Sequence, residues 1–299
     1  MPGFCHRMGV FKSPGLEAEM GFIYQGEVIA SRQNRRIVSL CKLADRKARQ
    51  AERRFRFDGI KLFSEALLRG VSLDAVYLQA SRADSIAQRI CDMTGISPEE
   101  VKCPVFLVAD DLFEKISEEN APEGVICVAE YIDKFHKMYK IKKEDVLPLP
   151  NGPVLLLESV RDPLNVGAII RSAAALGVQH LVLSQDCADL YHPKTLRAAM
   201  GPLFSMPISR VDDMAETIRG LVASGRRVFA AALDDNAAKL GEMPFVAGDC
   251  VVIGNEGHGL SQDVLEACTR SLYIPMQAGT ESLNAGVAAA LLMWELCRA

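Results

Sequence analysis

From residue 153 onward, short apolar runs alternate with segments whose apolar residues recur at helical spacing. The runs are five to seven residues long, at 153–159, 180–184, 227–233, 250–254 and 271–275. Helical spacing is found between and after them, at 166–176, 211–223, after Ser261 and at 283–297. Strands that are apolar on both faces are typical of parallel sheets covered by helices. The alternation therefore predicts an α/β domain with a mostly parallel sheet over residues 152–299.

An earlier part of the chain shows the same alternation on a smaller scale. Strand patterns occur at 55–58, before a glycine turn at Gly59, and at 73–78, 105–109 and 124–130, with helical patterns at 60–69, 86–93 and 111–117. They predict a separate small α/β domain over residues 31–131. Residues 1–30 show no periodicity and are expected to form a loosely ordered tail. Residues 132–151, with clustered lysines and two prolines, are predicted to be a linker, part of which can be helical.

Charge is concentrated near the start of the small domain. The net charge is -4, but residues 32–56 hold ten basic residues and two acidic ones, so this segment alone carries +8. Apolar residues at helical spacing in 34–54 predict one helix or two short ones, with the basic side facing water. Such a surface can bind nucleic acid, lie on an anionic surface or be an ordinary solvated face.

Composition excludes several classes of protein. No apolar stretch approaches the roughly 18 residues that span a bilayer, and the first residues lack the apolar core of a secretory signal. The nine cysteines form no CxxC pair and have no metal-ligand spacing with the five histidines. We expect a soluble cytoplasmic protein with reduced thiols and no metal site.

Three segments of the large domain place polar residues where strands end and helices begin, which is where open α/β sheets bind ligands. The first is ESVRDPLNVGAIIRSAAALG, residues 158–177. Asn165 is a candidate helix cap. Arg171 lies among apolar and small residues, and its permanent charge must reach water, a carboxylate or a phosphate. The segment is thus either a capped core helix or part of an anion-binding site.

The second segment is VVIGNEGHGLS, residues 251–261. Its glycines match neither a P-loop nor GxGxxG, and Glu256 would repel a phosphate. They predict a tight loop that wraps a small ligand with peptide groups. Glu256 is then a candidate ion-pair partner for an arginine such as Arg171 or Arg161, or an acceptor for a cationic ligand.

The third segment begins IPMQAGTESLNAG at residue 274, and either Ser282 or Asn284 is expected to start the last helix. Taken together, the three segments contain no Cys/His pair and no GxSxG elbow, which argues against a covalent hydrolase. A dinucleotide-binding oxidoreductase is excluded because its glycine fingerprint is missing.

In this order and spacing, NVGAIIRSA, IGNEGHGLS and IPMQAGTESLN resemble the three motifs of the SpoU (TrmH-like) RNA 2'-O-ribose methyltransferases of the SPOUT superfamily. FDGIKLFSEAL, LDAVYL and EGVICVAE in the small domain resemble the L30e-like substrate-binding domain often fused to these enzymes. The resemblance implies a C-terminal α/β trefoil-knot domain and a homodimer formed through the knot domains.

The resemblance also assigns residues. S-adenosylmethionine would be held by Ala232, Leu233, Gly254, Asn255, Glu256, Gly257, Ile274, Met276 and Leu283. Arg171 would be the central catalytic residue, organised by Asn165, Glu256, Ser282 and Asn284. The basic segment would contact RNA through Arg46, Lys47, Arg49 and Arg53.

The implied activity is transfer of a methyl group to a ribose 2'-hydroxyl. The L30e-like domain favours large-subunit ribosomal RNA as the substrate. Two alternatives stay open: a tRNA 2'-O-methyltransferase, and a non-catalytic knotted protein that binds RNA or assists ribosome assembly. Because a guanidinium stays protonated in proteins, we expect Arg171 to bind the adjacent phosphate and the nascent oxyanion, while a phosphate oxygen or water takes the proton.

Overall fold

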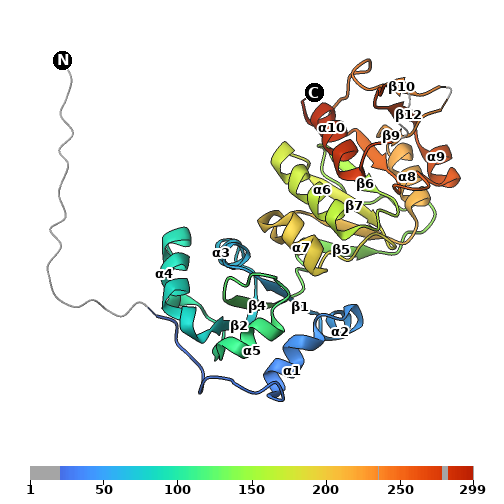
Figure 1. Ribbon diagram of the computed structural model, residues 1–299. Coiled ribbons are helices and arrows are strands. Elements are labelled where there is room, and N and C mark those ends of the chain that lie inside the picture. The colour runs from blue at the N-terminus through green and yellow to red at the C-terminus, as the bar shows by residue number, and fades with distance from the viewer. Residues whose placement is uncertain (1–20, 235, 278–281, 299) are drawn as a thin grey trace, which may run out of the picture.

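The computed structural model describes residues 21–234, 236–277 and 282–298, which form two α/β domains (Figure 1). In the N-terminal domain, a four-stranded sheet has the order β1-β4-β2-β3. Strand β4 is antiparallel to both β1 and β2, and β3 is parallel to β2. The strands are β1 (Arg54–Asp58), β2 (Leu73–Gln79), β3 (Val105–Val108) and β4 (Val125–Glu130); the helices are α1 (Arg35–Lys42), α2 (Arg46–Glu52), α3 (Ile60–Leu68), α4 (Ala83–Thr94) and α5 (Asp110–Ile116), with short 3-10 turns η1 (Ala80–Arg82) and η2 (Pro98–Glu100).

Part of the predicted loose tail is packed against this sheet. Tyr24 and Ile29 form isolated bridges with β3, and the Phe22 side chain is buried. Apolar side chains at these positions cover the edge of the sheet, which periodicity alone does not reveal. Residues 1–20, the rest of the predicted tail, lie outside the described residues.

The basic segment forms two short helices, as one of the sequence alternatives has it. Asn34 caps α1 and Asp45 caps α2 through hydrogen bonds from the first-turn N–H groups to their side-chain oxygens. The expectation that the basic side faces water is wrong for one residue. The Arg49 side chain points into the protein and is 1% exposed, because it has a buried acidic partner, described below.

In the C-terminal domain, eight strands form a sheet with the order β10-β12-β9-β11-β6-β7-β8-β5, and every neighbouring pair is parallel. The strands are β5 (His136–Tyr139), β6 (Val154–Leu157), β7 (His180–Ser184), β8 (Ile208–Val211), β9 (Val228–Ala231), β10 (Ala238–Lys239), β11 (Cys250–Ile253) and β12 (Arg270–Tyr273). The helices are α6 (Pro163–Leu176), α7 (Pro193–Ala199), α8 (Met214–Ala223), α9 (Gln262–Ala267) and α10 (Ala285–Cys297), with a 3-10 turn η3 (Gly201–Phe204).

Helices cover both faces of this sheet, as its apolar strands require. Alternate residues of a strand point to opposite faces. In β6, Leu155 and Leu157 belong to the same buried cluster as side chains of α6, α7 and α10, whereas Val154 and Leu156 belong to a second cluster with α8 and α9. Within the described residues, no helix has the length and apolar character needed to cross a membrane.

The predicted linker contributes a strand instead of a helix. Residues 136–139 form β5, the edge strand that pairs with β8. The sheet therefore begins inside residues 132–151. The connection gains regular hydrogen bonds there because the edge of β8 offers backbone donors and acceptors.

Candidate active site

Neighbouring parallel strands bring the predicted cofactor residues to one edge of the sheet. Strand β9 lies between β12 and β11, and β11 lies beside β6. Ala232 and Leu233 follow β9, residues 254–257 follow β11, and Ile274 and Met276 follow β12. Leu283 lies two residues before α10, a helix that packs on β11. Loops at the carboxyl ends of adjacent strands are where such sheets bind ligands.

The loop after β11 is a tight turn held by its own hydrogen bonds. The backbone groups of Asn255 and Gly259 pair in both directions, at 3.0 and 2.9 Å. The Asn255 side-chain oxygen accepts from the N–H of Gly257, and its amide donates to the Ser159 carbonyl at 2.8 Å. A Cβ on Gly254 would lie 2.3 Å from the Gly259 carbonyl carbon. A side chain at position 254 is therefore incompatible with this turn.

The loop after β6 is tied to the same region. The Glu158 carboxylate accepts hydrogen bonds from the N–H and the hydroxyl of Ser261, at 2.9 and 2.6 Å. In the neighbouring loop, partial burial opposes ionisation of Asp186, but hydrogen bonds from Ser159, Ser184 and Arg161 hold its pKa at about 2. These bonds join the first and second sequence segments into one rigid edge.

A row of three side chains links all three segments. The Asn165 amide donates to Glu256 Oε1 at 2.6 Å, and the Asn284 amide donates to Asn165 Oδ1 at 2.9 Å. Asn284 Oδ1 in turn accepts from the N–H of Gly286 and caps α10. Each amide has its oxygen and nitrogen committed to different partners, so the row has one orientation. The structure thus brings together three of the five predicted catalytic residues.

Comparison with known proteins identifies this arrangement. A family model described as the SpoU rRNA methylase family matches residues 152–294, and one described as the MRM3-like substrate binding domain matches residues 34–127. The Bacillus subtilis 23S rRNA (guanosine(2553)-2'-O)-methyltransferase RlmP is 31% identical over 90% of this chain and 98% of its own length. The chain belongs to the SpoU methylase family.

Other SpoU proteins agree in length and fold. The 23S rRNA (guanosine-2'-O-)-methyltransferase RlmB of Bordetella pertussis is 30% identical over 76% of this chain and 89% of its own. The solved structure of the SpoU methyltransferase AviRb from Streptomyces viridochromogenes, in complex with AdoMet, matches with a TM-score of 0.73 and 26% identity over 89% of this chain and 98% of its own. The predicted SpoU-type α/β class, preceded by a small α/β domain, is confirmed, and this chain is a methyltransferase. The knotted path and the L30e-like assignment stay predictions.

Within the SpoU domain, two details of the first segment differ from expectation. The cap of α6 is Asp162, whose side chain accepts from the N–H of Leu164, while Asn165 lies inside the first turn and is buried. Pro163 at the first helical position moves the cap to Asp162. The predicted ion pair of Glu256 is wrong as well. Arg161 pairs with Asp186 at 3.1 Å, and within the described residues no salt bridge joins Glu256 to Arg171.

Arg171 is exposed on α6 and stands apart from the row. At 100° per residue, six positions place it about 120° around the helix from Asn165. Among the described residues, Arg171 has no hydrogen-bond or ion-pair partner. Ser282 is also exposed and has no such partner within the described part of the chain, and residues 278–281 beside it lie outside that part. Within the described residues, no hydrogen bond or ion pair therefore joins Arg171 or Ser282 to the Asn165 row.

The edge of the sheet has the donors and apolar surface that an adenosyl ligand needs. Leu233 is 79% exposed and Met276 is 43% exposed, although both are apolar. Among the described residues, their backbone N–H groups have no acceptor. Free peptide donors beside exposed apolar side chains suit a purine nucleoside, since a purine offers ring acceptors and an apolar face.

Three of the four predicted RNA-binding residues are exposed. Arg46 and Lys47 point away from α2, and Arg53 stacks on the Tyr131 ring at 5.0 Å and pairs with Asp133. Sequence reasoning missed a groove of about 460 Å³ beside them, where Lys137 and other residues of the second domain face Arg46 and Arg53. No local pattern could have revealed this groove, because its two walls are distant in the sequence.

Proposed function

We propose that this chain transfers a methyl group from S-adenosylmethionine to a ribose 2'-hydroxyl in large-subunit ribosomal RNA, in the cytoplasm. The observation that carries the proposal is the Glu256–Asn165–Asn284 row at the edge where the three motif loops meet. The RNA target draws support from two relatives named for 2'-O-methylation of 23S rRNA. A relative crystallised with AdoMet supports the methyl donor.

The chain's own residues would hold and orient the reactants. When bound, S-adenosylmethionine supplies the methyl group on a sulfonium centre. The loops after β9, β11 and β12 would hold it through backbone groups of Leu233, Gly254 to Gly257, and Met276. The Asn165 row fixes how the Glu256 carboxylate is directed at that edge. Orienting two reactants in this way accounts for a large part of the rate of a bimolecular transfer.

Arg171 would act on the RNA. Its exposed guanidinium presents several donors in a plane, which suits a phosphate oxygen and the oxyanion that develops on the ribose. A phosphate oxygen or water would accept the 2'-hydroxyl proton, since a guanidinium has no free lone pair for it.

A homodimer is the second part of the proposal. Val287, Leu291 and Trp294 lie on one side of α10 at helical spacing, and each is at least 41% exposed. Leu164, 51% exposed, lies on α6, the helix packed against α10. An exposed apolar stripe of this kind marks a protein interface. Trp294→Asp is expected to convert a dimer to a monomer in sedimentation velocity, whereas an unchanged profile would contradict this interface.

Methyl transfer from labelled S-adenosylmethionine tests the function. The purified protein is incubated separately with unmodified ribosomal RNA and tRNA, with Arg171→Ala as the inactive variant and Arg219→Ala, an exposed arginine of α8, as the matched control. We expect label in large-subunit RNA that survives alkaline hydrolysis in a dinucleotide, because a 2'-O-methyl group blocks cleavage there. Label in tRNA would indicate the tRNA alternative. RNA binding without label would indicate the non-catalytic one.

A further inference from the structure

The two domains meet in a buried aromatic cluster. The Phe55 ring of β1 lies 4.5 Å from the Tyr191 ring, which comes from the loop after β7, and Phe57 lies 5.4 Å from Phe204 of η3. Tyr131, at the end of the first domain, stacks on Tyr191 at 4.2 Å. Phe55, Phe57, Tyr191 and Phe204 belong to one hydrophobic cluster. The domains therefore share a core and are not joined by the connection alone.

Hydrogen bonds beside this cluster fix how the two domains pack against each other. The N–H of Ile132 donates to the Tyr191 hydroxyl at 2.8 Å; because the carbonyl bonded to the other ring nitrogen of His136 can only accept, the neutral ring accepts at Nδ1 and the hydroxyl donates to it, also at 2.8 Å. The other ring nitrogen, Nε2, then carries the proton and donates to the Leu203 carbonyl at 3.0 Å. Three neighbouring polar groups are satisfied in one arrangement, which sliding of one domain against the other would break.

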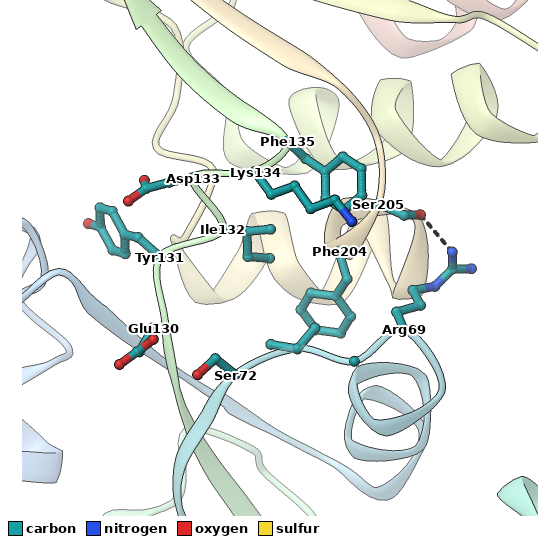
Figure 2. A pocket seen from close by; sticks show the side chains of 12 residues that line it. Arg69, Ser72, Glu130, Tyr131, Ile132, Asp133, Lys134, Phe135, Phe204 and Ser205 are labelled. Carbon is teal, nitrogen blue, oxygen red and sulfur yellow. Dashed lines mark hydrogen bonds between the residues drawn. The ribbon is translucent and has the colours of Figure 1, made fainter.

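Hydrogen bonds also close the opposite side of the interface. Figure 2 shows Arg69, after α3, reaching across to Ser205, after η3, and its guanidinium donates to that hydroxyl at 2.6 Å. The two residues line a cavity of about 430 Å³, together with Phe204 and the start of the connection. Bonds on both sides of a packed core oppose hinge motion between the domains.

Arg49 makes a charged contact between the two domains. One guanidinium nitrogen donates to Asp189, in the loop after β7, at 2.7 Å, and the other donates to the carbonyls of Leu43 and Ala44 at 2.8 and 2.7 Å. The arginine side chain is 2% exposed and the aspartate side chain 16%. A buried pair contributes little net stability but disfavours any arrangement that separates the charges. It therefore selects one orientation of α2.

We propose that Arg49 is a positioning residue that holds the N-terminal domain at one fixed orientation to the methyltransferase site. Arg46 and Lys47 lie on the same helix, so the basic surface is fixed along with α2. A substrate RNA must then present its target nucleotide at a set distance from the segment that α2 contacts. The distance and orientation between the RNA-contacting surface of α2 and the methyltransferase site would then determine which nucleotide is methylated. The inference rests on the proposed RNA methylation.

The test opens the interface without leaving a buried charge. The double variant Arg49→Met/Asp189→Asn removes both partners, since removal of one alone would leave the other charge uncompensated. Arg219→Met is the matched control, being an exposed arginine of α8 whose ion pair with Glu216 lies within one helix and away from the interface. Tyr191→Phe, which keeps the stacked ring and removes the hydroxyl bonds, serves as a second and milder opening variant.

Three readouts are compared with the wild type. Hydrogen exchange is expected to rise at the N–H of Ile132 in the double variant and at the N–H of residue 191 in Tyr191→Phe, since neither group loses its own acceptor there, and to stay unchanged at both in Arg219→Met. The kcat/KM for an RNA long enough to reach α2 is expected to fall by about 10- to 100-fold, as misplaced reactants do. The kcat/KM for a short fragment around the target nucleotide, and the Kd for S-adenosylmethionine, are expected to stay within about twofold.

Other results overturn the proposal. An interface that stays closed in both opening variants means that Arg49 is not what holds it. An open interface with undiminished activity on the long RNA means that orientation is not used. Equal losses on long and short RNA mean damage within the catalytic domain. If the wild-type protein methylates no RNA, both the proposed function and this inference are wrong. That outcome can be told apart from the others because it is observed without any variant.

Discussion

Asn165 and Glu256, 91 positions apart in the sequence, are joined by a hydrogen bond of 2.6 Å from the asparagine amide to the carboxylate. The bond makes the direction of the carboxylate depend on α6. Asn165→Asp replaces the donor with a second carboxylate, which would repel Glu256. We expect single-turnover methyl transfer to fall by about 10- to 100-fold. Asn151→Asp, at an exposed position, is the control and should remain active. Full activity of the Asn165 variant would show that the row is structural.

The tight turn after β11 is expected to be needed for cofactor binding. In Gly254→Ala, the new Cβ meets backbone atoms of Gly259 and Leu260 at 2.3 to 2.5 Å, so the turn must open. Gly21→Ala is the control, because no atom lies within 4 Å of the new Cβ and the position is far from the predicted cofactor loops. Isothermal titration with S-adenosylmethionine should show about tenfold or greater weakening for the first variant and little change for the second. Equal affinities would place the cofactor away from this turn.

Arg171→Lys separates charge from geometry. Lysine keeps the positive charge but lacks the planar fork that can contact a phosphate and an oxyanion together. We expect a fall in kcat of about 100-fold with RNA affinity nearly unchanged, measured by single-turnover transfer and by filter binding. Near-normal turnover would mean that the fork is not used.

Two partly buried histidines, His136 and His180, predict a loss of stability in mild acid. Burial lowers the pKa of His136 from 6.5 to about 4, and it lowers the pKa of His180 to about 4 as well. Below pH 6.5 the unfolded chain takes up protons that the folded protein refuses, so the free energy of unfolding falls as the pH drops toward 4. For His136 alone the change is about 3 kcal/mol. Carboxylates such as Asp186 contribute at lower pH, since their unfolded pKa is 3.8.

Urea unfolding at pH 7, 5.5 and 4.5 measures this effect. His136→Gln should be less stable than the wild type at pH 7, because it loses well-placed bonds, and should show a flatter pH dependence. His258→Gln, in an exposed loop, should follow the wild type. A His136→Gln profile as steep as that of the wild type would mean that His136 does not cause the acid sensitivity.

Exposed cations of α2 predict salt-dependent RNA binding. Arg46→Gln/Lys47→Gln should weaken binding and reduce the slope of log affinity against log salt by about one for each phosphate that the variant no longer neutralises. Lys115→Gln, an exposed lysine of α5 paired with Asp111, is the control. An unchanged slope would leave α2 as a solvated face.

The features of the fold and site that depend on local sequence pattern were predictable. The strand runs at 153–159 and 250–254 are largely apolar, and the segments that follow them carry SpoU motifs, so their meeting at one edge follows from parallel pairing. Asn284 as the cap of the last helix was also predictable, since asparagine is a preferred cap.

Long-range contacts were not predictable. The burial of Arg49 depends on Asp189, 140 positions away, and nothing in the pattern of a basic helix distinguishes an arginine that faces inward from those that face water. Strand β5, with the sequence HKMY, and strand β8, with ISRV, are short and polar for strands, and each is stabilised by the neighbouring strand more than by its own pattern. Helix α7 was not predictable either, because its seven residues show no clear apolar periodicity.

The origin of β5 determines how this protein can be divided. A fragment that begins at residue 152, where the family match starts, would lack the edge strand and expose the backbone of β8 along the side of the sheet. Unpaired edges of this kind recruit strands from other molecules and promote aggregation. The methyltransferase half would also lose Tyr131 and Phe55 as partners of Tyr191. The methyltransferase half is therefore not a self-sufficient unit, and the two domains are expected to unfold together.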